Sequence, residues 1–177
     1  IEQYNFFGPY ARYFFIKAEM FGLMVPGYHR YQDASAGMDI RLFGLFPVMK
    51  FQGGVLNQAE TVTLLNEICL MAPAALVSPH IHWESIDEFH AKAIFTNGPQ
   101  VVSAILEFNA KAELVNFYSN DRTDTSDMKN YPFSTPCVAY KDQQGYWLMS
   151  EGQATWHYPE GPFVYGEFRV KKIEYNI

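Results

Sequence analysis

The sequence predicts a mainly β, or β-rich α+β, fold: a curved antiparallel sheet or half-barrel of roughly nine to eleven strands wrapping one central helix at about residues 57–72. Aromatic residues make up 17% of the 177 residues, and they favour strands and large apolar interiors. Apolar and polar residues alternate over much of the chain after residue 80, whereas helical spacing dominates one segment. Because no repeat and no linker divides the chain, residues 1–177 are expected to form a single domain.

The first third of the chain predicts strands. Residues 10–21 have the composition of a strand, although their aromatic residues are too dense for a clean alternation. Pro26-Gly27 is a turn signal, and residues 28–54 after it predict two or three further strands.

Residues 57–72 predict the central helix. Asn57 and Glu60 have the spacing of a capping box, in which the two side chains satisfy free N–H groups of the first turn. Apolar residues recur behind them at helical spacing, so the helix is expected to be amphipathic, and Pro73 ends the regular pattern. The recurring apolar residues are Val62, Leu65, Ile68, Cys69 and Ala72.

The C-terminal half predicts a series of hairpins. Residues 101–108 alternate so that Val102, Ala104, Leu106 and Phe108 share one face. The polar residues 120–136 are expected to form the longest loop. Turn signals near residues 144–145 and at 159–162 separate the last strands.

Charge and composition exclude some partners. The net charge is −6 and no basic patch occurs, so neither nucleic acid nor an anionic membrane surface is an expected partner. No run of 18 apolar residues is present, so no membrane-spanning segment is predicted. The sequence starts at Ile1 rather than at a methionine, which leaves room for a preceding signal or membrane anchor. Cys69 and Cys137 are expected to be buried free thiols and specify no compartment, and nothing specifies an oligomeric state.

Three of the five histidines lie close together in the sequence, at His80, His82 and His90. If Trp83 pairs with Ala91 on the core face of a hairpin, these histidines gather on the opposite, solvated face. Such a face lacks the enclosed pocket of a catalytic zinc site, so a polar sheet surface is the favoured interpretation and no metal ligand is assigned. A surface metal site formed by the three histidines is the alternative.

Large aromatic residues are spread over successive predicted strands. Such a set either fills a solid core or lines a hollow one, and the sequence favours neither. In a hollow interior Arg41 would meet an acidic head group of a ligand, whereas the commoner alternative for such an arginine is to extend to solvent. The expected lining of that cavity is Trp83, Phe95, Phe108, Phe117, Trp156, Leu65 and Arg41.

No catalytic motif is recognisable. The chain lacks a nucleophile elbow, a phosphate-binding loop and a dinucleotide fingerprint, so neither a cofactor nor a catalytic residue is assigned. Asp121-Arg122 is interpreted as a structural pair at a sheet edge. The alternative functions are an enzyme that uses Asp121, Arg122 and the histidines at the sheet mouth, and a structural or protein-binding module.

The chain from about residue 36 to residue 175 resembles a family of uncharacterised, mainly bacterial proteins known only as a domain of unknown function. The resemblance is carried by "GMDIRLFGLFPV", "AETVTLLNEICLMAPAAL", "SPHIHWESIDEFHAKA", "SNDR" and the segment that begins "GYWLMSEGQATWHYPEGPF". The matching single residues are Pro79, Trp83, Ile86, Asp87, Ala91, Trp156, Pro159, Gly161, Phe163, Tyr165 and Tyr175. The histidines are not part of this pattern, and the resemblance implies no catalytic residue.

The order of elements, hairpins followed by a helix and then a longer set of hairpins, is more distantly similar to the LolA/LolB-type half-barrel. That resemblance implies a lipid-like or other apolar small molecule held between sheet and helix, without catalysis. It also implies a location in the cell envelope or outside the cell.

Overall fold

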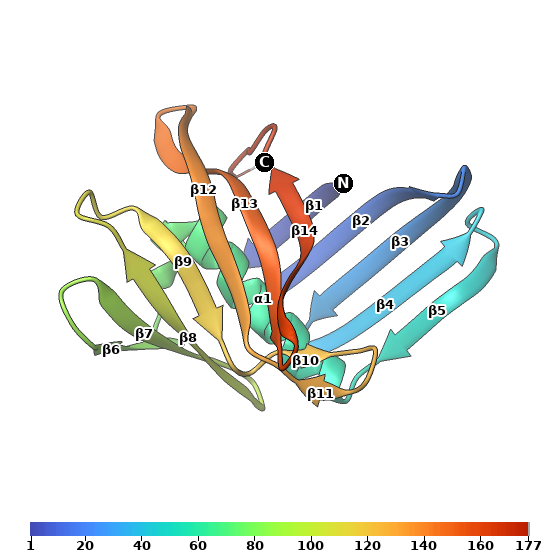
Figure 1. Cartoon of the computed structure of the whole chain (residues 1–177), viewed down its shortest axis with the longest axis horizontal. Coiled ribbons are helices and arrows are strands. Elements are labelled where there is room, and N and C mark those ends of the chain that lie inside the picture. The colour runs from blue at the N-terminus through green and yellow to red at the C-terminus, as the bar shows by residue number, and fades with distance from the viewer. Residues whose placement is uncertain (177) are drawn as a thin grey trace.

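The computed structural model describes residues 1–176, and it contains two antiparallel sheets that spread apart around one helix (Figure 1). The first sheet is formed by β1 (Glu2–Phe7), β2 (Tyr10–Met20), β3 (Leu23–Gln32), β4 (Ser35–Leu42) and β5 (Phe46–Gln52). The helix α1 (Val55–Met71) and the short η1 (Pro73–Leu76) follow. The remaining strands are β6 (Ile81–Ser85), β7 (His90–Asn97), β8 (Gln100–Phe108), β9 (Leu114–Ser119), β10 (Thr123–Asp124), β11 (Lys129–Asn130), β12 (Phe133–Gln143), β13 (Tyr146–Tyr158) and β14 (Gly161–Arg169).

The predicted mainly β class with antiparallel pairing is confirmed, but the predicted single wrapping sheet is wrong. Five strands form a meander in the order β1-β2-β3-β4-β5, and seven form a second sheet in the order β14-β13-β12-β9-β8-β7-β6. Strands β10 and β11 form a small pair inside the segment predicted to be a loop. Neither large sheet closes on itself in residues 1–176, and α1 lies between them (Figure 1).

Pro26 and Gly27 lie inside β3 rather than in a turn, so the turn prediction was wrong. Ten consecutive residues of β3 pair with β2, and Pro26 pairs with Lys17. On its other side β3 pairs with β4 only from Gly27 onward. The position of Pro26 therefore requires no ladder hydrogen bond from the N–H that proline lacks.

The helix begins two residues earlier than predicted, and the capping box is wrong. Gly54 precedes the first turn, and no side chain caps it. The Asn57 side chain instead accepts a hydrogen bond from the Ala36 N–H of β4 (2.8 Å). The helix is buried on most sides, including at Thr61 and Asn66, because a sheet lies on each side of it. The prediction of an amphipathic helix was therefore also wrong.

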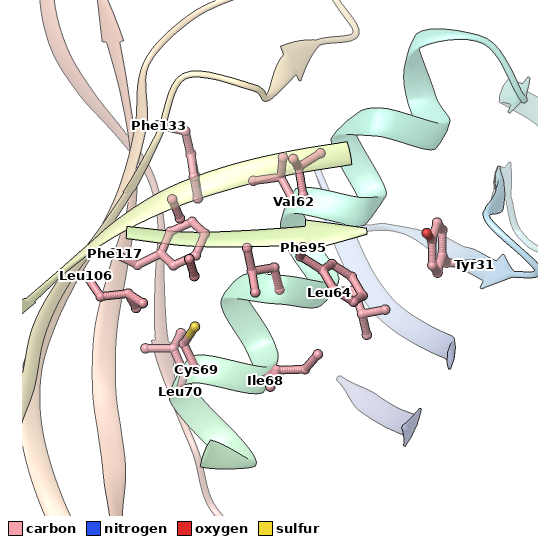
Figure 2. Packing of buried hydrophobic residues seen from close by; sticks show 14 of the residues in the cluster. Tyr31, Val62, Leu64, Ile68, Cys69, Leu70, Phe95, Leu106, Phe117 and Phe133 are labelled. Carbon is pink, nitrogen blue, oxygen red and sulfur yellow. The ribbon is translucent and has the colours of Figure 1, made fainter. Parts of the chain in front are cut away.

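The core joins α1 to both sheets (Figure 2). Phe95, Phe117 and Phe133 of the seven-stranded sheet pack with Val62 and Ile68, among other residues of α1. On the opposite side, Tyr31 of β3 is fully buried and its hydroxyl hydrogen-bonds Thr61 Oγ1 (2.8 Å) and the Asn97 side chain (2.8 Å). Each fully buried large apolar side chain contributes roughly 1.5–3 kcal/mol of transfer free energy.

Two further features bear on function. In residues 1–176, no helix combines the length and the apolar composition required to cross a bilayer. Both cysteines are free thiols, with Cys69 buried and Cys137 half-buried. Burial raises the pKa of Cys137 to about 12, so its thiolate is disfavoured at neutral pH.

Candidate functional site

Three of the residues expected to line a cavity are in the solid core. Phe95, Phe117 and Leu65 have no accessible surface, and a side chain beside a water-sized cavity would keep some. The hollow-interior hypothesis is therefore wrong for these positions, where α1 and the seven-stranded sheet pack directly against each other.

Trp83, Phe108 and Trp156 lie in three separate places. Phe108 lines a pocket of about 180 Å³ near the C-terminal end of α1, together with Cys69 and Tyr140. Trp83 is 38% exposed and lines an open depression of about 370 Å³ beside η1. Trp156 is buried, and its ring packs edge-on against Phe133 at 5.4 Å. The structure does not bring these aromatic residues together around one ligand.

Arg41 does not face the interior. Its guanidinium is exposed and forms a salt bridge with Asp39 two residues earlier on β4 (2.8 Å). It lies next to the inward-facing Ile40, so strand alternation directs it to the outer face. The expectation that Arg41 meets an acidic head group inside a cavity was wrong.

The histidines lie apart, so the structure does not support the alternative surface metal site. The hairpin pairs Trp83 with Ala93, two residues from the predicted partner, and this even shift leaves every side chain on its predicted face. His80 packs against the Tyr10 ring (5.6 Å), whereas His90 hydrogen-bonds Asp87 (2.8 Å). In the described residues, no three His, Cys, Asp or Glu side chains are arranged to hold a metal ion.

Asp121 and Arg122 bind different partners. The Asp121 carboxylate accepts hydrogen bonds from the N–H (2.6 Å) and hydroxyl (3.0 Å) groups of Ser103. Arg122 donates to the Tyr165 hydroxyl of β14 (2.7 Å), and its guanidinium lies over the Phe133 ring at 4.0 Å. The predicted Asp121–Arg122 pair was wrong, because neighbouring residues of an extended segment point in opposite directions.

A buried charge cluster lies where α1 meets the five-stranded sheet. Arg12 of β2 donates from Nε to both carboxylate oxygens of Glu67 (2.8 Å each) and from NH1 to Glu60 (2.9 Å). His29 of β3 lies 3.7 Å from the Glu60 carboxylate, and the Asn5 side chain of β1 donates to Glu67 (3.3 Å). Arg12, Glu60 and Glu67 are all buried, so this network links the helix to three strands.

The pKa values of the two carboxyl groups in the cluster are shifted in opposite directions. Burial alone would raise the pKa of Glu60, but the charge of Arg12 and the nearby His29 side chain lower it to about 2. Burial raises the pKa of Glu67 despite its bonds to Arg12, and the negative charge of Glu60 adds to this effect. The fold therefore favours the ionised form of Glu60 and disfavours the ionised form of Glu67.

Beyond the cluster, the inner face of the five-stranded sheet is apolar and less buried. Next to the helix, the cross-strand row Arg12–Tyr31–Ala36 is buried. Farther out, Ile16, Ile40 and Met49 are half-buried or exposed, although Gly27 in the same row and Val25 in the next row are buried, and Met20–Leu23 at the end of the face is exposed. The sheet is longer than the core that covers it, so part of its inner face is uncovered (Figure 1).

The edge strand β14 also carries exposed aromatic side chains. Phe163 pairs with Trp156 and so lies on the inner side of its sheet, where it is more than half exposed. Tyr165 packs on the same Trp156 ring (6.1 Å). Apolar side chains are therefore partly exposed both on the five-stranded sheet and on β14.

Sequence reasoning missed Arg12, His29 and Tyr165 as members of this region. One signal was present: Glu60 and Glu67 are seven residues apart, which is two helical turns, so both lie on one face of a helix that has no other charged residue. Nothing in the local sequence indicated that Arg12 on a distant strand would face them.

Comparison with known proteins identifies the family. No curated protein and no solved structure matches the chain. One family model matches residues 1–168, which confirms the resemblance detected over residues 36–175 and extends it to the N-terminal strands. The chain therefore belongs to the family of unknown function DUF6544.

Proposed function

We propose that this protein binds a lipid-like or other apolar small molecule, without catalysis, on the uncovered inner face of its five-stranded sheet. The observation that carries the proposal is the composition of that face: its outer rows remain apolar where the helix no longer covers them. Exposed apolar surface is unfavourable in water, and a contiguous patch is typical of a binding site. The proposed site therefore lies outside the core rather than between α1 and the seven-stranded sheet.

An acyl chain with an anionic head group suits this region. The chain would lie along the apolar rows that include Ile16 and Ile40, opposite Phe163. Arg122 lies at the inner side of β14, donates one hydrogen bond to Tyr165, and has no carboxylate within 4.0 Å among residues 1–176. A guanidinium with free N–H donors binds a carboxylate or phosphate well.

The half-barrel of LolA/LolB type is part of the same proposal. The two sheets would correspond to one curved sheet interrupted between the edge strands β14 and β1, with α1 on its concave side. The fit is one of architecture, and such a carrier would work in the cell envelope or outside the cell.

Ligand extraction and titration test the proposal. The full chain is purified, its bound molecules are identified by native mass spectrometry and solvent extraction, and a fluorescent fatty acid is titrated into the delipidated protein. Replacing Ile16 with Glu places a charge on the apolar face and should weaken probe binding at least about tenfold. The matched control is Phe15→Glu, because Phe15 is the next residue on β2 and faces the other side.

Probe binding that is equal in the two variants would place the ligand elsewhere. The absence of both a co-purified lipid and probe binding would overturn the proposal.

A further inference from the structure

Two neighbouring hairpin tips carry a dense group of exposed apolar side chains. The β2–β3 turn and the β4–β5 turn project from the same end of the five-stranded sheet, far from α1 (Figure 1). Phe21 is 96% exposed and Leu45 is 71% exposed. The Phe43 N–H donates to the Met24 carbonyl (2.8 Å), so the two turns form one surface. We call this surface the tip surface; its exposed members are Met20, Phe21, Leu23, Met24, Phe43, Leu45 and Phe46.

Both turns contain the same three-residue sequence and an unfavourable backbone at its first residue, although the β2–β3 loop has two residues and the β4–β5 loop has three. Each contains Phe-Gly-Leu, with the Phe in the left-handed region (φ 54° for both Phe21 and Phe43) and a Gly after it (φ 76° and 73°). Tight hairpin turns of this kind favour Asn, Asp or Gly at the first position, and a bulky aromatic residue is strained there. Asn in place of Phe would relieve both the strain and the exposure, so each turn retains an aromatic residue at the expense of stability.

The tip surface itself carries no charge, so it suits a partner without net charge. Residues 20–24 and 42–46 contain no charged side chain. Among the flanking residues, Arg41 is neutralised by Asp39, and Glu19, which is exposed and pairs with Met24, is one negative charge beside the surface. The whole chain carries a charge of −6, which opposes approach to anionic lipids. The chemistry therefore fits the apolar boundary of a zwitterionic bilayer rather than a charged surface.

A second copy of the chain fits this surface less well. The tips are the narrow ends of two hairpins, and seven side chains on such ends cannot supply the area of about 800 Å² per partner that stable protein interfaces bury. A bilayer has no such requirement, because it surrounds each inserted side chain.

From these observations we infer that the tip surface docks the protein onto zwitterionic lipid bilayers by inserting Phe21, Phe43 and Leu45 into the interface. The tip surface is continuous with the outermost row of the inner face, Met20–Leu23. Docking would therefore bring the end of the proposed ligand site to the membrane. The inference itself rests on the tips and does not require that a ligand binds.

Vesicle co-sedimentation tests the inference. The full chain is mixed with phosphatidylcholine vesicles at about 0.1 M and about 0.5 M salt. Bound protein is expected at both concentrations, because insertion of uncharged side chains is not screened. The double variant Phe21→Asn/Phe43→Asn should bind at least about tenfold more weakly. Its melting temperature should not fall, because Asn tolerates the left-handed turn position.

A matched double variant controls for a general loss of exposed apolar residues. Val101→Asn/Val138→Asn removes two exposed side chains from the other sheet and should bind vesicles like the unmodified chain. Ile16→Glu should also still bind vesicles, which separates docking from ligand binding.

Three results would overturn the inference: no sedimentation of the unmodified chain, equal binding by the Phe21→Asn/Phe43→Asn variant, or binding only to anionic vesicles that is lost at high salt. Dimerisation of the free chain that the same variant abolishes would show that the occupant is a second copy.

Discussion

Glu60 and Glu67 share one arginine, but they differ in what they contribute to stability. The pKa of Glu60 in the folded chain is about 2, below its ordinary value of 4.5, so its ionised form stabilises the fold. At neutral pH this corresponds to about 3 kcal/mol. We therefore expect Glu60→Gln to lower the free energy of unfolding by about that amount, measured by urea denaturation at pH 7.

Glu67→Gln is the matched variant, and it should cost much less at pH 7. The pKa of Glu67 is raised by burial, so its neutral form is the one that the fold favours, and glutamine resembles that neutral form. Its amide oxygen can still accept a hydrogen bond from Arg12. Equal losses in the two variants would contradict the opposite pKa shifts of Glu60 and Glu67.

The same two residues predict a pH dependence. The contribution of Glu60 is fully present above pH 4.5 and is lost as the pH falls from 4.5 towards about 2. The raised pKa of Glu67 has the opposite sign: its stabilisation is present below 4.5 and is lost as the pH rises through its folded pKa. The difference in stability between the unmodified chain and Glu60→Gln should therefore shrink on acidification, and an unchanged difference at pH 3 would contradict this account.

At the residue scale, the sequence predicted the face of the sheet on which a side chain lies better than it predicted what that side chain contacts. Strand alternation placed Trp83 on the inner face and His82 on the outer face correctly, although the pairing differed by two residues. It could not predict which side chains Arg41 and Asp121 contact. A charged residue on a strand can point to solvent or to a buried partner, and the outcome depends on neighbouring strands that the local sequence does not specify. The Arg12 cluster depends on contacts between residues 48 and 55 positions apart, and local pattern does not encode such contacts.

At the scale of elements, turn and helix signals succeeded where one local effect dominates. Pro159 and Glu160 form the turn between β13 and β14, inside the segment 159–162 predicted to turn. The helix end next to Pro73 was nearly right, because proline cannot continue a helix. The start of the helix and the Pro26 turn were wrong, because neighbouring strands decided the outcome through Ala36 and Lys17.

Close packing of β13 against β14 gives a prediction for Gly152. A Cβ atom at this position would lie 2.7 Å from the Phe168 ring and 3.2 Å from the Pro136 carbonyl oxygen. Gly152→Ala should therefore lower the free energy of unfolding by about 1–3 kcal/mol. The control is Gly166→Ala on β14, where the nearest atom, the Ala154 Cβ, would be at an ordinary contact distance of 3.7 Å.

Phe168→Leu shortens the clashing side chain and should reduce the penalty of Gly152→Ala in the double variant. If Gly152→Ala were tolerated as well as Gly166→Ala, the Phe168 ring would not be held over Gly152 in solution.

At the scale of the whole molecule, composition and periodicity predicted the mainly β class but not the separation into two sheets. The alternation of a strand specifies which side chains are buried, and it does not specify which sheet a strand joins. Most strand pairs in each sheet join strands that are close in the sequence, whereas α1 packs against both sheets. Strands of both sheets contact α1: β3, β4 and β5 on one side, and β8, β9 and β13 on the other.

The position of α1 leads to a prediction about cooperativity. The expectation of a single domain requires the two sheets to unfold together, because their main shared partner is one helix. All three tryptophans, Trp83, Trp147 and Trp156, belong to the seven-stranded sheet, so tryptophan fluorescence reports on that sheet alone. Hydrogen exchange at the Tyr31 amide of β3 reports on the five-stranded sheet. We expect fluorescence and circular dichroism to give one coincident denaturation curve. We also expect Leu65→Ala in α1 to lower the hydrogen-exchange protection of the Tyr31 and Phe95 amides by the same free energy, about 2–5 kcal/mol. Two separate transitions, or loss of protection in one sheet only, would show that the sheets fold as independent units.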